Sequence, residues 1–156
     1  MSNVLGEFEV TLDAKGRFMI PTGFKKQLSE AEGARFVLNR GFEKCLTLYT
    51  LEQWKKVESV VRQLNDFNKK ARQFKRVFLN GATYLEPDAA GRLLIPKSML
   101  AYAGITKDMM MNAQVDKIEL WDLATHAAEI ASYGEVADSI DTEMLGSNFM
   151  NSIEGL

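Results

Sequence analysis

Two pairs of charged residues stand at the same spacing in this chain and could together bind an anion or the edge of a nucleic-acid base. Asp13 precedes Arg17 by four positions, and Asp88 precedes Arg92 in the same way. An arginine guanidinium offers planar donors that match phosphate oxygens and the edge of guanine. A carboxylate at this spacing could orient the guanidinium. The alternative is a local ion pair that only shapes a turn, and the residues alone leave both interpretations open.

Each pair belongs to a longer phrase that occurs twice. The first copy, at 13–21, reads Asp-Ala-Lys-Gly-Arg-Phe-Met-Ile-Pro, and the second, at 88–96, reads Asp-Ala-Ala-Gly-Arg-Leu-Leu-Ile-Pro. An internal repeat of this quality indicates two versions of one structural unit. The copies differ in charge at one position, because Lys15 of the first copy corresponds to Ala90 of the second.

The phrase predicts a tight hairpin. Apolar and polar residues alternate over 7–12, which indicates a half-buried strand before the first copy. Aspartate followed by glycine three residues later suits a type I turn with a glycine bulge, the role that we assign to Gly16 and Gly91. The next residues form the returning strand, which the proline ends. Lys15 then lies near the hairpin tip, and the Asp and Arg side chains lie at its neck.

The remaining elements also repeat. Short helices are predicted over 22–28 and 97–103, with Gly104 ending the second, and strands over 35–38, 45–49, 109–111 and 118–121. Thr50 and Gln53 form a capping box for a helix, Asp66 or Asn68 can cap another that ends near 79, and Asp122 can cap a third that reaches about 133. We expect a first unit over 5–50, a helical connector over 51–80, a second unit over 81–125, and a C-terminal helix with a flexible acidic tail over 126–156.

Charge is distributed unevenly along the 156 residues. Residues 1–81 hold 15 Lys or Arg and 9 Asp or Glu, whereas residues 82–156 hold 4 and 12. Such asymmetry suggests that the first half faces a polyanion. Lys25, Lys26 and Arg40 are candidates for positioning phosphates. The basic run over 69–76 is predicted to be the polar face of a helix whose Phe74 and Phe78 are buried.

Catalytic, metal and membrane patterns are not found in the sequence. One histidine, His126, and one cysteine, Cys45, make no cluster of metal ligands, and Cys45 begins an apolar strand that favours a place in the core. No glycine-rich phosphate loop occurs. We therefore expect a protein that is not an enzyme, with no metal, cofactor or small-molecule substrate. No stretch approaches the ~20 apolar residues of a membrane span, and a lone cysteine fits a reducing cytoplasm.

The doubled Asp-x-x-x-Arg hairpins resemble the MraZ family of bacterial proteins, which have two fused SpoVT–AbrB-type swapped-hairpin domains. Further landmarks of this family occur in order and at matching spacing: Gly6-Glu7-Phe8, Arg40-Gly41 before 45–49, Trp54, Phe78-Leu79-x-Gly81-Ala82, and the segment 118–122. The resemblance covers about 5–130. It implies an α+β fold of tandem duplicated, AbrB-like β-barrel units built from swapped hairpins, with peripheral helices.

The resemblance also implies a role. Members of the family are nucleoid-associated transcriptional regulators that bind short repeated boxes of double-stranded DNA, upstream of the operon for cell division and wall synthesis, as ring-shaped homo-oligomers. Residue by residue, the resemblance carries over only to the motif residues, Asp13 with Arg17 and Asp88 with Arg92. Lys15 is a further candidate because its place at or near the hairpin tip could let it reach bases or phosphates. Because the second hairpin lacks the lysine and lies in the acidic half, we expect the first to carry most of the contact. The alternative is a non-catalytic oligomeric scaffold or an AbrB-type antitoxin with a protein partner.

Overall fold

The computed structural model describes residues 3–136 and residue 153. Contacts divide the chain into two units, Met1–Leu123 and Ala124–Leu156. The strands of the described chain all belong to the first unit. The second unit holds most of α5 (Leu123–Ala131) and all of α6 (Tyr133–Val136). The start of the expected flexible tail, 134–136, belongs to α6, and the rest of it, apart from residue 153, lies outside the described residues.

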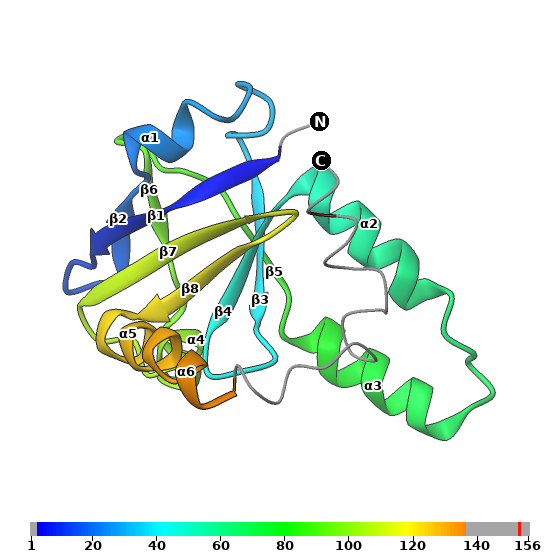
Figure 1. Ribbon diagram of the computed structural model, residues 1–156. Helices are drawn as coiled ribbons and strands as arrows, with labels where there is room; N and C mark the ends of the chain where they lie inside the picture. Colours follow the sequence, from blue (N-terminus) through cyan, green and yellow to red (C-terminus); the bar gives the residue numbers. More distant parts are fainter. Residues whose placement is uncertain (1–2, 137–152, 154–156) are drawn as a thin grey trace. The chain divides into compact units, whose positions relative to one another are not determined.

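Eight strands form two antiparallel sheets. Six of them lie in the order β1-β7-β8-β4-β3-β5, and β2 pairs with β6 in a separate ribbon (Figure 1). The strands are β1 (Val4–Thr11), β2 (Arg17–Met19), β3 (Phe36–Arg40), β4 (Leu46–Thr50), β5 (Thr83–Leu85), β6 (Arg92–Leu94), β7 (Asp108–Val115) and β8 (Ile118–Asp122). Because each sheet contains strands from both sequence repeats, the two repeats fold together.

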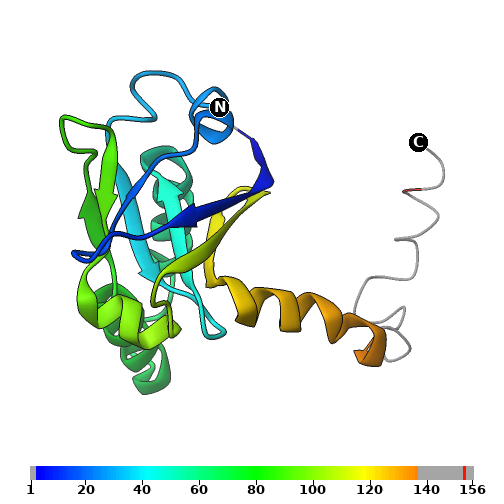
Figure 2. The ribbon, with the colours of Figure 1, turned by 90° about the vertical axis from the view of Figure 1, so that its left-hand side faces the viewer.

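The order of the strands shows an exchange between the repeats. β1 of the first repeat pairs with β7 of the second, and the two run side by side in Figure 2. Conversely, β5 of the second repeat pairs with β3 of the first. Each repeat keeps one hairpin of its own, β3–β4 or β7–β8, and these meet through β4 and β8. The predicted α+β fold of tandem duplicated units is confirmed, and the strands of the two sequence repeats are intertwined.

The predicted hairpin is right at its turn and wrong in its strand pairing. The Asp13 backbone N–H donates to the Arg17 carbonyl at 2.9 Å, and the Gly16 N–H donates to the Asp13 carbonyl at 3.0 Å. Beyond this neck, however, β2 pairs with β6 rather than with β1. The reason is burial: the exchanged pairing places Phe18 and Leu93 opposite each other in the shared core, at 1% and 0% exposure.

The helices lie where the local sequence signals predicted them. α1 (Thr22–Lys25) and α4 (Lys97–Ala103) come after the two prolines, although α1 is shorter than expected and the chain continues in turns. Thr50 and Gln53 complete both hydrogen bonds of the capping box at the start of α2 (Leu51–Arg62). Asn68 caps α3 (Lys69–Asn80). Gly104 ends α4 with φ of 66°.

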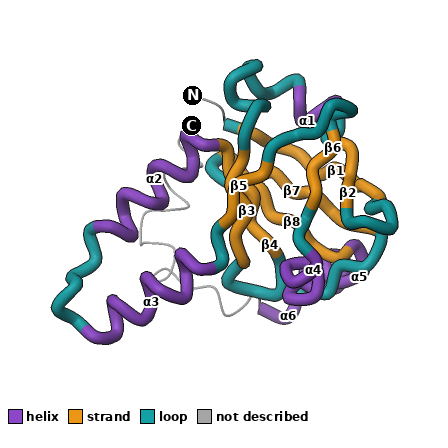
Figure 3. Tube along the Cα trace, turned by 180° about the vertical axis from the view of Figure 1, so that it is seen from behind, coloured by secondary structure: helices purple, strands orange, loops and turns teal. Residues whose placement is uncertain are grey.

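The α2–α3 pair projects from the side of the sheet away from the β2–β6 ribbon (Figures 1 and 3). The Trp54 ring of α2 stacks on the Phe78 ring of α3, with centroids 6.0 Å apart. No residue of α3 is buried. The expectation that Phe74 and Phe78 are both buried is therefore wrong, since Phe74 is 42% exposed and Phe78 is half-buried.

The single cysteine and the single histidine of the chain are both buried. Cys45 is fully buried, as its apolar strand predicted. His126 in α5 is 5% exposed. No helix among the described residues is long and apolar enough to cross a membrane.

Candidate nucleic-acid interface

The β2–β6 ribbon brings both copies of the repeated phrase onto one surface. Its register places Arg17 opposite Leu94, Phe18 opposite Leu93, and Met19 opposite Arg92. Directly opposed residues of a ribbon point to the same face, and successive residues alternate between faces. Because the central pair faces the core, the other four side chains share the outer face. We call this set, Arg17, Met19, Arg92 and Leu94, the ribbon face.

Asp13 both shapes its turn and orients Arg17. One oxygen, Oδ1, accepts hydrogen bonds from the backbone N–H groups of Lys15 and Arg17, both at 2.9 Å. The other, Oδ2, accepts from Arg17 Nε at 2.6 Å. These bonds, the backbone one from Arg17 foremost, lower the pKa of Asp13 to about 2. The ion pair uses only Nε, and the terminal amino groups of Arg17 make no hydrogen bond with the described residues.

The second copy has the same geometry. Asp88 Oδ1 accepts from the N–H groups of Ala90 at 3.0 Å and Arg92 at 2.9 Å, and Oδ2 accepts from Arg92 Nε at 2.9 Å. The pKa of Asp88 is lowered chiefly by the backbone hydrogen bond from Arg92. Both arginines are thus held by the nitrogen nearest the chain. The turn-shaping interpretation and the arginine-orienting one are therefore compatible in both copies.

Each turn requires its glycine. Gly16 has φ of 87° and Gly91 has φ of 85°, a region that residues with a Cβ rarely adopt. A Cβ on Gly16 would also lie 3.0 Å from the Ile95 carbonyl oxygen. At Gly91 the nearest atom to such a Cβ is Met19 Sδ, at 3.6 Å.

The candidate lysines lie at the ends of the ribbon. Lys15 is exposed in the turn before β2. Ala90, its counterpart, carries no charge, but Lys25 of α1 lines a cavity of about 270 Å³ together with the turn over 88–91. Figure 3 shows α1 beside the end of β6. The fold therefore brings a lysine to each turn, from the turn itself in one copy and from α1 of the other repeat in the second.

Two other candidates lie elsewhere. Lys26 is exposed immediately after α1, where its backbone N–H donates to the Thr22 carbonyl. Arg40 ends β3, and its guanidinium carbon lies 5.4 Å from the centre of the Tyr102 ring. Arg40 is not part of the ribbon face, whereas Arg17 and Arg92, which the sequence placed in two hairpins, are brought together there.

Sequence reasoning missed Met19 and Leu94. Both were grouped with the apolar residues of the returning strand, yet they are 54% and 52% exposed. The available signal was the alternation of a strand, which buries only the central position of each three-residue segment.

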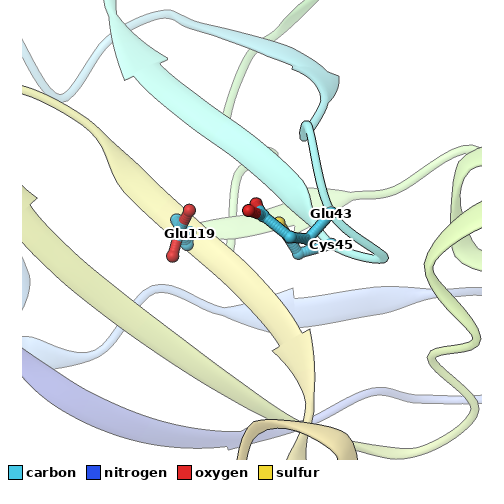
Figure 4. A group of neighbouring side chains, drawn as sticks. All are labelled: Glu43, Cys45 and Glu119. Carbon is cyan, nitrogen blue, oxygen red and sulfur yellow. The ribbon is translucent and has the colours of Figure 1, made fainter. Parts of the chain in front are cut away.

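A second group of side chains has the types that bind metals. Figure 4 shows Glu43 and Cys45 next to Glu119 of the neighbouring strand β8, with ligand atoms within 4.8 Å of one another. Burial, with the two carboxylates adding to it, raises the pKa of Cys45 to about 12. Glu119 is engaged by Gln114 Nε2 at 2.8 Å and Trp121 Nε1 at 3.2 Å. Within the described chain, no other observation points to a ligand at this group, so it carries no metal proposal.

Matches to known proteins extend along nearly the whole chain. The family model described as "MraZ protein, putative antitoxin-like" matches residues 4–77 and again residues 78–143. Three curated relatives are each named transcriptional regulator MraZ. The protein of Flavobacterium psychrophilum is 39% identical over 149 residues, covering 94% of both chains, and that of Christiangramia forsetii is 34% identical over 154 residues, covering 98% of this chain and 99% of the relative.

The third relative, from Cytophaga hutchinsonii, is 40% identical over 116 residues, covering 74% of this chain and 77% of its own. Among solved structures, a solution structure from Pyrococcus horikoshii covers 76% of this chain and 88% of its own, with a TM-score of 0.32 and 17% identity, too distant to support an argument. The doubled family match and the identity across most of the chain agree with the duplicated fold. The chain therefore belongs to the MraZ family.

Proposed function

We propose that this protein is a sequence-specific DNA-binding transcriptional regulator that reads bases with the ribbon face, in the cytoplasm at the nucleoid. One observation carries the proposal: two arginines, each oriented by its own aspartate, lie on the same exposed face of a two-stranded ribbon. A ribbon of this kind fits the major groove of B-DNA, where guanine presents two acceptors to a guanidinium.

The aspartates support this proposal through preorganisation. A free arginine loses side-chain freedom on binding, which weakens an interface. Asp13 and Asp88 hold Nε in the unbound protein, so part of this loss is already incurred on folding. The terminal amino groups remain available as donors to O6 and N7 of guanine.

The lysines fit the second half of a DNA contact, the phosphate backbone. Lys15 and Lys25 flank the two turns, and Lys26 follows Lys25. We propose that these residues position the ribbon on the duplex while the arginines discriminate bases. Because the fold brings one lysine to each turn, we propose that both hairpins contact DNA.

We further propose that the protein acts as a ring-shaped homo-oligomer on repeated promoter boxes. A few cationic side chains give one copy modest affinity, and linked copies gain effective concentration at adjacent boxes. That the boxes lie upstream of the operon for cell division and wall synthesis rests on the family alone.

The α2–α3 pair supports self-assembly. An open apolar groove of about 390 Å³ runs along it, lined mainly by aliphatic and aromatic side chains that include Val60, Phe74 and Phe78. Val60 and Val77 are 65% and 64% exposed. α3, which contributes to the groove, carries the basic run over 69–76, whereas residues 82–156 are strongly acidic. We propose that the acidic half of a second copy docks here, because a head-to-tail contact of this type can close a ring.

The deciding experiment is a selection from a random duplex pool with the wild type, Arg17→Ala, Arg92→Ala and a control variant, Lys55→Ala on α2. We expect the wild type and the control to enrich one short box, most strongly in tandem copies. Each arginine variant should weaken binding to that box by about 1–3 kcal/mol and relax the preference at one position. If the wild type enriches nothing at moderate salt, the DNA proposal fails, and a copurifying protein partner would favour the antitoxin alternative.

A further inference from the structure

The ribbon face holds two apolar side chains that the arginine contacts leave unused. Met19 stands opposite Arg92, and Leu94 stands opposite Arg17, so cationic and apolar positions alternate around the face. Met19 is 54% exposed and Leu94 is 52% exposed. Half of the outward positions of a six-residue ribbon are thus apolar and open to water.

The core does not require these two side chains. Phe18 and Leu93 already fill the inner face at this level, and Ile20 and Ile95 continue the core beyond them. Met19 and Leu94 instead lie against the turns of the opposite repeats. Met19 Sδ is 3.6 Å from the place of a Cβ on Gly91, and Leu94 Cδ1 is 4.0 Å from the place of a Cβ on Gly16.

This placement gives each apolar side chain one supported side and one exposed side. The glycine turn lies against the supported side, and the outer surface is available for a ligand. It also sets the two apolar groups at diagonal positions, each next to one oriented arginine across the ribbon. Cross-strand neighbours lie about 5 Å apart, comparable to the ~3.4 Å step between bases along one DNA strand.

We infer that Met19 and Leu94 form two subsites for the C5-methyl group of thymine, beside the bases contacted by Arg92 and Arg17. In the major groove, thymine is the base that presents an apolar group, and apolar side chains recognise it there. This inference rests on the proposed function, since it names what the same face reads besides hydrogen-bonding edges. The two subsites would let a six-residue ribbon specify thymine as well as guanine.

The test removes only the methyl groups. A duplex enriched from the random pool by the wild type is remade with deoxyuridine in place of thymidine, one position at a time, and its Kd is measured by fluorescence anisotropy. We expect binding to weaken about fourfold, the effect of one buried methyl group, at the positions under Met19 and Leu94. All other positions should be insensitive.

Side-chain truncation then links each methyl group to its subsite. Met19→Ala should abolish the sensitivity to deoxyuridine at one position, and Leu94→Ala should abolish it at the other, as a double-mutant cycle requires. The control is Leu5→Ala on β1, which truncates another exposed apolar residue, 60% exposed, away from the ribbon face. It should keep the full sensitivity.

The outcomes separate the two proposals. If no position responds to deoxyuridine, or if the variants respond as the wild type does, the thymine subsites are overturned while the DNA proposal stands on Arg17 and Arg92. If the wild type enriches no duplex at all, the DNA proposal itself fails, and the thymine subsites fail with it. Thermal melting of each variant checks that the chain remains folded.

Discussion

The carboxylates of Asp13 and Asp88 each hold one turn of the ribbon in shape. Each accepts two backbone hydrogen bonds and holds one guanidinium, so a single side chain links the shape of the turn to the direction of the arginine. Substitution should therefore affect stability and DNA binding together. The ionisation of the carboxylate provides a way to separate the two.

Asp13→Asn should lower the melting temperature at neutral pH, because the amide loses the ion pair with Arg17. The folded pKa of Asp13 is about 2, below the ordinary aspartate value of 3.8. A lowered folded pKa means that the unfolded chain binds more protons between these values, so stability rises with pH there. The contribution is present above about 4 and lost as the pH falls towards 2. Melting curves of both proteins from pH 2 to 7 should converge at the acid end; a constant gap would contradict this account.

The two turn glycines should differ in sensitivity. Gly16→Ala and Gly91→Ala both force an unfavourable positive φ, which costs about 1–2 kcal/mol. Gly16→Ala should cost more, since its Cβ would approach the Ile95 carbonyl oxygen at 3.0 Å, whereas at Gly91 the nearest neighbour is a flexible methionine at 3.6 Å. Urea unfolding measures the free energy of unfolding of both variants. Equal losses of stability would show that backbone strain alone sets the cost of the substitution.

At the scale of elements, the DNA-binding surface that we propose combines the ribbon with its flanking helix α1. The second turn lacks the lysine of the first, yet α1 of the other repeat places Lys25 beside it. The sequence alone shows a second turn without a lysine, because the compensating residue lies in another repeat. The exchange of strands is what brings the two together.

Lys15→Ala and Lys25→Ala should therefore have similar effects on DNA binding. Each removes one phosphate contact, so the slope of log Kd against log salt concentration should fall by about one in either variant. Binding isotherms of the enriched duplex between low and high salt measure this. A change of slope in Lys15→Ala alone would mean that the second turn does not approach the backbone.

The elements divide sharply into those that could be predicted from the sequence and those that could not. The turn at Asp13, the capping box at Thr50 and the left-handed Gly104 depend on residues within a few positions, so local chemistry was sufficient. The pairing of β2 with β6 and the exposure of Phe74 depend on which distant segment packs against each strand or helix. Local periodicity carries no information about that partner.

At the scale of the whole molecule, both repeats share one core, and the charged halves differ in sign. Leu38 and Leu48 of the first repeat pack in the same cluster as Met111 and Leu120 of the second. The apolar surface of α2–α3 remains open. The repeats thus share one core, and among the described residues the α2–α3 groove is the surface on which we propose that a second copy docks.

Replacing apolar residues of that groove by charged ones should reduce self-assembly. Val60 and Phe74 both line the groove, and both side chains are exposed. We expect Val60→Asp and Phe74→Asp to shift the mass measured by multi-angle light scattering towards the single chain, while leaving the melting of the core nearly unchanged. Leu5→Asp is the matched control. Raising the salt concentration should also weaken assembly, and an unchanged mass from low to high salt would show that charge does not close the ring.

The ends of the ribbon are unequal, and this gives the bound molecule a direction. One end carries a lysine in the turn itself, and the other receives its lysine from a helix, so a half rotation does not restore the same surface. A two-fold symmetric binding surface binds a DNA site equally well in either orientation. A surface with two unequal ends distinguishes the two orientations. Successive copies on one promoter would therefore need boxes that all have the same orientation.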